Sequence, residues 1–234
     1  MDKIIESVIS GKKAALIDMD GVLYDSMPYH AKAWRHTMLT LGIDREESEF
    51  FLYEGMTGPA TINLLMQQEK GVTLSMEECR KIYAVKSDFF RHQSCVKPMP
   101  GADRMICALR RAGIRTVLVT GRAQSTLLDR LDHDYPGAFP KEMRVTALDV
   151  TNGKPHPEPY LQGLKKAGVS PDEAIVIENA PLGVRSGKAA GIFTVAVTTG
   201  PIPRSAFVME QADAIFNSMT EFADVLEKRQ LSGE

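Results

Sequence analysis

The sequence has few cysteines, almost no net charge and no long hydrophobic segment. Its three cysteines, Cys79, Cys95 and Cys107, are widely spaced and form no CxxC pair. This spacing argues against a disulfide framework or a structural zinc site and favours a reducing compartment. Lys and Arg total 28 against 30 Asp and Glu, which gives a net charge of −2. Without a basic excess, no nucleic-acid partner is expected.

No stretch of the sequence approaches the roughly 20 apolar residues that a membrane span requires. The first ten residues, MDKIIESVIS, interrupt their apolar run with Glu6 and Ser7, so we do not expect a signal peptide. We predict a cytoplasmic protein without a membrane partner, present as a monomer or weak dimer. The length of 234 residues fits one core domain with a modest insertion.

Short apolar runs alternate with helical patterns along most of the chain. Runs that are apolar on both faces, as in parallel strands covered by helices, occur at 14–18, 116–120, 143–147, 174–178 and 193–197. The intervening segments ADRMICALRRAG and PEPYLQGLKKAG have helical periodicity and end at Gly113 and Gly168, where a C-cap glycine belongs. This alternation predicts the α/β class, with a doubly wound, Rossmann-like parallel sheet.

One segment departs from this alternation. Residues 27–96 have helical periodicity and no convincing strand, and one of their helices is predicted to open at Ser75. The chain returns through the Pro/Gly-rich sequence KPMPG at 97–101. We therefore predict a helical cap domain at 27–96, inserted into an α/β core domain formed by 1–26 and 97–234.

The first candidate site is Asp18-Met-Asp20-Gly21, directly after an apolar strand. In an open parallel sheet, ligands bind at the carboxyl ends of the strands. Two carboxylates held close together raise each other's pKa unless a cation lies beside them, and a divalent cation would also allow an anionic nucleophile to approach a phosphate. The alternative interpretation is an ordinary acidic turn or N-cap.

Three further polar clusters follow in the same order as the strands. Thr120-Gly121 ends the second strand and offers a hydroxyl and exposed N–H groups to a phosphoryl oxygen, although such turns are common. Lys154 lies between Gly153 and Pro155, and its fixed ammonium would balance the two aspartates; most lysines are simply solvated. Glu178-Asn179 supplies hard oxygen ligands suited to Mg²⁺, or caps the next helix.

Together the segments DMDGVLYDS, VTG, GKPHPEPY and IENAPLGV resemble the four motifs of the haloacid dehalogenase superfamily, and most closely its β-phosphoglucomutase-like branch. The resemblance implies that Asp18 is the nucleophile and forms an aspartyl phosphate, and that Asp20 is the general acid/base. It implies that the transferring phosphoryl group is held by Thr120, Gly121 and Lys154.

The same resemblance implies a Mg²⁺ cofactor. Its ligands would be the Asp18 carboxylate, the backbone carbonyl of Asp20 and the side chain of Asn179, with Glu178 either a direct ligand or a partner of the ligands. Members of the family commonly have a second aspartate where this chain has Asn179, so one negative charge is missing from the expected metal site.

The cap segment bears on the substrate. Where the β-phosphoglucomutases carry a lysine and an arginine that grips the distal phosphate, this chain has Glu54 and Gly58, which argues against a mutase. Glu54 is interpreted as a metal ligand on cap closure, or else as a solvated loop acid. In this respect the chain is similar to the inorganic pyrophosphatase-type members.

Lys86 and His30 are candidate contacts to the distal phosphate. The alternatives are a solvated lysine and a histidine that only packs at the hinge.

These observations favour hydrolysis of inorganic pyrophosphate as the first hypothesis. The alternatives are hydrolysis of small phosphate monoesters, such as sugar phosphates or phosphoglycolate, and, further from the observations, β-phosphoglucomutase activity. A non-catalytic binding protein on the same fold is the fourth hypothesis. The presence of Asp18, Asp20 and Lys154 together argues against it.

Overall fold

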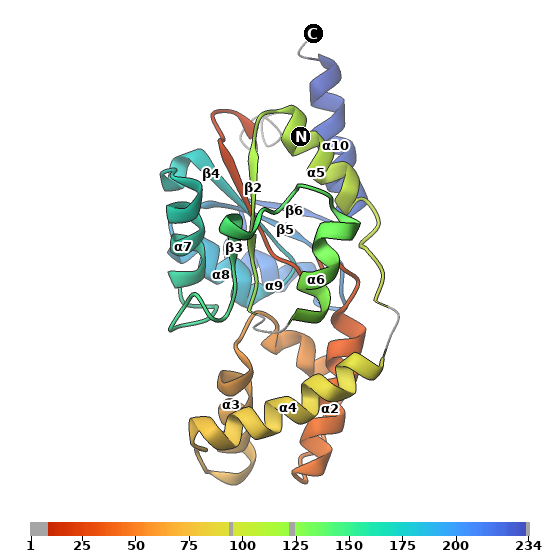
Figure 1. Cartoon of the computed structure of the whole chain (residues 1–234), viewed down its shortest axis with the longest axis vertical. Coiled ribbons are helices and arrows are strands. Elements are labelled where there is room, and N and C mark those ends of the chain that lie inside the picture. The colour runs from red at the N-terminus through yellow and green to blue at the C-terminus, as the bar shows by residue number, and fades with distance from the viewer. Residues whose placement is uncertain (1–8, 94–95, 122–124, 233–234) are drawn as a thin grey trace.

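A parallel sheet covered by helices on both faces forms the larger part of the molecule, and a separate group of helices lies beyond one end of the sheet (Figure 1). The structure is a computed structural model that describes residues 9–93, 96–121 and 125–232. The sheet has six strands in the order β3-β2-β1-β4-β5-β6. The strands are β1 (Ala14–Ile17), β2 (Arg115–Val119), β3 (Arg144–Val145), β4 (Ala174–Glu178), β5 (Phe193–Val197) and β6 (Ala214–Phe216).

The central strand β1 shows why these sequences form a parallel sheet. It pairs in parallel with β2 on one side and β4 on the other, and all four of its residues are buried. Ala15 and Ile17 belong to the hydrophobic cluster of one face, and Ala14 and Leu16 to that of the other. Since both faces are covered, the strand is apolar at every position rather than alternating, and the predicted fold class is confirmed.

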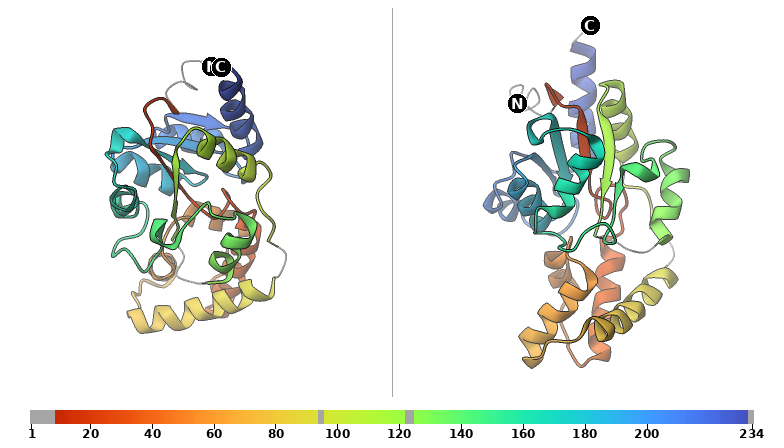
Figure 2. Two further views of the ribbon diagram at one scale, coloured as in Figure 1. Left: turned by 45° about the horizontal axis from the view of Figure 1, so that its top comes forward. Right: turned by 60° about the vertical axis from the view of Figure 1, so that its left-hand side comes forward.

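Helices cover the two faces in separate layers (Figures 1 and 2). One layer holds α5 (Ala102–Arg111), α6 (Ser125–Asp134) and α10 (Met219–Ser232). The other holds α7 (Glu158–Ala167), α8 (Pro181–Ala189) and α9 (Arg204–Met209). The helix α7 ends at Gly168, which has a φ of 64°, so the predicted C-cap glycine adopts the left-handed conformation that favours this residue.

The inserted helices form a small bundle with its own apolar core. They are α2 (Met27–Thr40), the 3₁₀ helix η1 (Glu47–Tyr53), α3 (Gly58–Lys70) and α4 (Met76–His92). Trp34, Phe50 and Leu65 are buried at their centre. Ser75 caps α4 in a reciprocal arrangement with Glu78, as the sequence predicts for a helix that opens at a serine followed by acids.

Two chain segments connect the bundle to the sheet, and they lie side by side. The backbone N–H of Asp25 donates to the carbonyl of Lys97 at 2.9 Å, and that of Met99 donates to Leu23 at 2.8 Å. These bonds tie the outgoing and returning segments together next to β1. On this basis we propose that the cap domain comprises residues 27–96 and the core domain residues 1–26 and 97–234. None of the described helices has the length and hydrophobicity to cross a bilayer.

Candidate active site

Asp18 and Asp20 follow β1 at the edge of the sheet that faces the cap. The backbone N–H of Asp18 donates to Ile177 at 3.0 Å and so continues the strand pairing, which places its buried carboxylate at the strand end. Gly21 then turns the chain with a φ of 79°. A Cβ at Gly21 would lie 1.8 Å from Nδ2 of Asn179, so only glycine allows the first motif and Asn179 to approach so closely.

Lys154 joins the first and fourth motifs. Its side chain is 1% exposed, and its Nζ donates to Oδ1 of Asp18 at 2.5 Å, to Oε1 of Glu178 at 2.5 Å and to the carbonyl of Val119 at 3.1 Å. The three protons of the ammonium therefore have three acceptors. The sequence predicts the ammonium of Lys154 beside Asp18 and Asp20, whereas its ion pairs are with Asp18 and Glu178. At 1% side-chain exposure it is not a solvated lysine.

Burial and charge shift the proton affinities of this pair. Burial raises the pKa of Asp18 to about 8, against the opposing effect of Lys154. Burial alone would lower the pKa of Lys154, but the carboxylates of Asp18 and Glu178 outweigh it and raise that pKa. Without a further cation, the Asp18 carboxyl therefore tends to hold a proton near neutral pH.

Glu178 uses both of its carboxylate oxygens within the protein. Oε1 accepts from Lys154 and, at 2.7 Å, from Oη of Tyr160. Oε2 accepts the backbone N–H groups of Asn179 at 3.0 Å and Ala180 at 3.2 Å. Of the two predicted roles for Glu178, this arrangement favours the partner of the ligands over the direct ligand, since each oxygen already has two donors.

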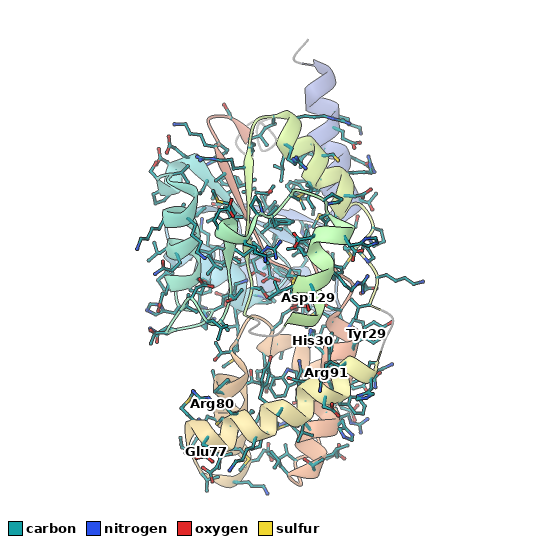
Figure 3. All side chains as sticks on the ribbon, in the orientation of Figure 1. Tyr29, His30, Glu77, Arg80, Arg91 and Asp129 are labelled. Carbon is teal, nitrogen blue, oxygen red and sulfur yellow. The ribbon has the colours of Figure 1, made fainter. Side chains whose placement is uncertain are left out.

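A chain of polar contacts connects Asp20 to the cap. Ser26 donates its hydroxyl to Oδ1 of Asp20 at 2.5 Å, and Nε2 of His30 lies 3.2 Å from the same oxygen. On the other side of the imidazole ring, Nδ1 lies 2.5 Å from Nζ of Lys86. Figure 3 shows His30 on α2 at the end of the cap that faces the sheet.

Lys86 is 4% exposed, so the interpretation of a solvated lysine is wrong. Its ammonium lies 5.3 Å from the ring centroid of Trp34 and 5.7 Å from that of Tyr83, distances typical of cation–π contacts. His30 stacks on Phe90 with the ring centroids 4.2 Å apart. His30 thus packs at the hinge and contacts Asp20 as well.

Glu54 brings a carboxylate from the cap to the core. It is 9% exposed, so it is not a solvated loop acid, and its Oε1 accepts from Nδ2 of Asn179 at 3.1 Å. Burial raises the pKa of Glu54 well above its usual range, and the charges of Asp18 and Glu178 raise it further. A carboxylate in this position needs a proton or a cation beside it.

Two buried oxygen atoms at this contact, Oε2 of Glu54 and Oδ1 of Asn179, have no hydrogen-bond partner among the described residues. Buried polar atoms are nearly always paired, and carboxylate and carboxamide oxygens are preferred ligands of Mg²⁺. These residues therefore fit a divalent cation. Within the described ranges, no three His, Cys, Asp or Glu side chains form a metal cluster by themselves. The predicted ligand set also includes the carboxamide of Asn179 and the main-chain carbonyl of Asp20, which are ligands of other types.

A cavity of about 70 Å³ lies between the cap and the core. Most of the predicted site residues line it, namely Asp18, Asp20, His30, Glu54, Lys86, Thr120 and Gly121. Its remaining wall is largely apolar, formed by Met27, Trp34, Phe50, Tyr53, Met56 and Tyr83 together with Gly55 and Gly58. Seven of the ten predicted site residues thus meet at one small cavity, and the other three, Lys154, Glu178 and Asn179, are not among its described lining residues.

The cap segment 54–57 sits directly on the core loops. A Cβ at Gly121 would lie 3.1 Å from the carbonyl oxygen of Gly55, and one at Gly153 would lie 2.6 Å from Cγ2 of Thr57. Gly55 has a φ of 87° and packs on the Lys154 side chain. Sequence reasoning missed Thr57, Ser26 and Tyr160. Ser26 and Tyr160 had a signal, since they end the segments DMDGVLYDS and GKPHPEPY, and Thr57 had none.

Comparison with known proteins is consistent with this geometry. Residues 12–191 match the family model of the haloacid dehalogenase-like hydrolases. Hexitol phosphatase A of Escherichia coli is 30% identical over 211 residues, covering 89% of this chain and 92% of its own. A putative pyrophosphatase, PpaX of Clostridium perfringens, is 27% identical over 217 residues, covering 92% and 98%. The solved structure of a putative β-phosphoglucomutase from Bacteroides vulgatus is 42% identical, with a TM-score of 0.89 over 97% of this chain and 95% of that one.

These relatives support the β-phosphoglucomutase-like branch and do not single out its pyrophosphatase-type members. The pyrophosphatase named above is less similar to this chain than the hexitol phosphatase is. The particular resemblance to pyrophosphatases, drawn from Glu54 alone, therefore has less support than the resemblance to the branch as a whole.

Proposed function

The chain belongs to the haloacid dehalogenase-like hydrolases, and we propose that it is a magnesium-dependent phosphatase that hydrolyses small phosphate monoesters through an aspartyl phosphate on Asp18. The single observation that carries the proposal is the buried contact of Lys154 with Asp18 at the end of β1. A fixed, buried cation beside a carboxylate is what an anionic nucleophile needs in order to approach phosphorus.

The proposed reaction has two steps. A carboxylate oxygen of Asp18 attacks phosphorus and forms the acyl phosphate, while the bond from phosphorus to the leaving oxygen breaks and Asp20 gives that oxygen a proton. A water molecule then attacks the acyl phosphate, Asp20 takes its proton, and Asp18 and inorganic phosphate are released. Thr120 and Gly121 line the cavity beside Asp18 and are assigned to the phosphoryl oxygens. Lys154, whose three protons go to Asp18, Val119 and Glu178, is assigned to balancing the charge of Asp18.

Asp20 is suited to the role of acid and base. Ser26 and His30 both contact its Oδ1, so its carboxyl group is held in one orientation at the cavity wall. His30 in turn contacts Lys86 of the cap. Because these contacts cross from α2 to α4, the orientation of Asp20 depends on the packing of the cap.

Mg²⁺ would be held by the Asp18 carboxylate, the main-chain carbonyl of Asp20 and Asn179, with Glu54 added from the cap. When bound, it would neutralise negative charge on the phosphoryl oxygens. The unpartnered oxygens of Asn179 and Glu54 support this ligand set. Glu178 is assigned instead to holding Lys154.

The cavity favours an organic leaving group. Aromatic side chains, including Trp34 and Tyr83, make up much of its wall, and Lys86 is the one Lys or Arg among its described lining residues. The leaving group of pyrophosphate is itself an anionic phosphate, which would need several cations in the cavity to bind it. The similarity to a hexitol phosphatase also supports an organic phosphate ester, rather than pyrophosphate, as the substrate.

The size of the cavity limits the size of the phosphate ester that it can hold. Its volume of about 70 Å³ holds roughly five to seven water molecules at about 10–15 Å³ each, fewer than the non-hydrogen atoms of a hexose phosphate. A hexose phosphate would require the cap to open further than in this structure. We therefore expect esters of two- or three-carbon compounds to be hydrolysed faster than hexose phosphates.

Pyrophosphate remains the second candidate because of one observation, the contact of Glu54 with Asn179. A cation held between these residues would reduce the repulsion between Glu54 and a second phosphoryl group. Mutase activity has less support: the cap has Gly58 where the mutases grip the distal phosphate with arginine, and no arginine occurs among the described residues that line the cavity.

The deciding experiment measures phosphate release with Mg²⁺ from glycol, triose and hexose phosphates and from pyrophosphate, at equal concentrations. The proposal expects the highest kcat/KM for a two- or three-carbon ester. A preference for pyrophosphate by tenfold or more would replace the first candidate with the second. Conversion of β-glucose 1-phosphate to glucose 6-phosphate in the presence of the bisphosphate would instead establish a mutase.

A further inference from the structure

Tyr160 contacts the catalytic charge network from outside the cavity. It lies on α7, six residues after Lys154, and is fully buried. Its Oη donates to Oε1 of Glu178 at 2.7 Å, and its ring centroid lies 5.0 Å from Nζ of Lys154. It is not among the residues that line the cavity, so any effect on the reaction must pass through Glu178 or Lys154.

The sheet fixes the position of the Tyr160 ring. The ring belongs to the hydrophobic cluster that contains Leu16 of β1, Val119 of β2 and Leu164 of α7. A tyrosine has only two side-chain torsions, so this packing sets the position of the hydroxyl as well. Burial, followed by the charge of Glu178, raises the pKa of Tyr160 well above its usual range, and the phenol therefore stays a hydrogen-bond donor at neutral pH.

The hydroxyl shares an acceptor with the catalytic lysine. Oε1 of Glu178 receives both Tyr160 and Lys154, while backbone N–H groups occupy Oε2. The ammonium itself is divided between Glu178 and Asp18, each at 2.5 Å. If the phenol donor were removed, Oε1 would be left to the ammonium alone, which would draw Lys154 toward Glu178 and away from Asp18.

We propose that Tyr160 is a positioning residue that fixes Glu178 and thereby keeps the ammonium of Lys154 between Glu178 and the nucleophile Asp18. The inference rests on the proposed phosphatase function and adds to it a residue that touches neither the substrate nor the reacting atoms. A tyrosine is required for this role because phenylalanine fills the same space without a donor.

The test is Tyr160→Phe, which removes one oxygen atom and keeps the ring. We expect about a tenfold loss of kcat, equivalent to about 1.4 kcal/mol in the activation barrier, with KM within about twofold of the wild type. Thr116→Val is the matched control: its hydroxyl is also buried and donates to the carbonyl of Ala138, but it lies at the opposite end of β2. This control should keep full kcat even if its Tm falls.

A double-mutant cycle of Tyr160→Phe and Lys154→Met tests whether Tyr160 acts on kcat through the ammonium of Lys154. With no ammonium to position, Tyr160→Phe should change the residual single-turnover rate by less than about twofold. A kcat for Tyr160→Phe equal to that of the wild type would overturn the inference, and so would the same tenfold loss in both backgrounds. Failure of the wild-type protein to hydrolyse any phosphate ester or anhydride would instead reject the proposed function itself.

Discussion

Substituting Gly153 tests whether the reaction requires the cap segment 54–57 to sit on the core. Gly153 precedes Lys154, and its backbone is outside the left-handed region, so Gly153→Ala causes no strain of its own. The new Cβ would lie 2.6 Å from Cγ2 of Thr57 and 3.4 Å from the Thr57 nitrogen. The first distance is a clash with a cap residue, and the second is close to ordinary contact.

The size of the effect follows from that distance. Carbon atoms pack best at about 3.5–4.0 Å, so the overlap is about 1 Å, and overpacking of this kind costs about 1–3 kcal/mol. The protein can avoid the clash by leaving the cap open, so the cost falls on closure rather than on folding. We expect kcat/KM to fall about 5- to 150-fold with little change in Tm.

The assay compares four variants by steady-state kinetics and thermal unfolding. Thr57→Ala removes the clashing methyl group, and because Thr57 makes no side-chain capping bond, this variant alone should resemble the wild type. The double variant should recover most of the lost kcat/KM. Gly200→Ala is the control within the same interface, since its Cβ would lie 3.4 Å from Phe51. Normal activity of Gly153→Ala, or a double variant as slow as the single one, would refute the reasoning.

Three further predictions concern the charges of the site. Asp18→Asn should abolish phosphate release while retaining the Tm of the wild type; measurable turnover would exclude Asp18 as the nucleophile. Glu54→Gln should weaken Mg²⁺ binding about tenfold or more in calorimetric titrations, and an unchanged dissociation constant would remove Glu54 from the ligand set. In metal-free protein, burial raises the pKa of Asp18 to about 8, so between about pH 4 and pH 8 the folded protein holds a proton that the unfolded chain has lost. Its Tm should therefore fall as pH rises from 5 to 8, and saturating Mg²⁺ should remove this slope in scanning calorimetry; a flat Tm without metal would contradict it.

The parallel sheet explains how much of the site the sequence predicts. Asp18, Thr120 and Asn179 each follow a strand, and the carboxyl ends of parallel strands meet at one edge. Their proximity therefore follows once the strands are recognised from continuous apolar runs. In contrast, β6 has only three residues, too few for an apolar pattern to identify. The strand predicted at 143–147 is present as β3 but keeps only two residues, Arg144 and Val145, and neither strand bears on the site.

Contacts between helices of the cap, and contacts of the cap with the core, could not be predicted in this way. Lys86 resembles a solvated lysine in the sequence, because its burial depends on Trp34 from another helix and on His30 at the hinge. The approach of Thr57 to Gly153 depends on how the cap sits on the core, which no local pattern specifies. Helical periodicity shows that a helix has an apolar face but does not identify the element that covers it.

The distribution of charge at this interface links cap closure to cation binding. In the closed arrangement, the carboxylate of Glu54 lies near the carboxylates of Asp18 and Glu178. The ion pairs of Lys154 are with Asp18 and Glu178 and not with Glu54. Closure therefore brings a third buried carboxylate beside two others, which is unfavourable unless it takes up a proton or a cation. A divalent ion that contacts both Glu54 and Asn179 binds the closed form more tightly than the open form, and by linkage it favours closure to the same extent. We therefore expect the cap to close over a metal-loaded site and to remain open more often without metal, so that Asp18 is enclosed with its substrate only when the cation needed for the reaction is bound.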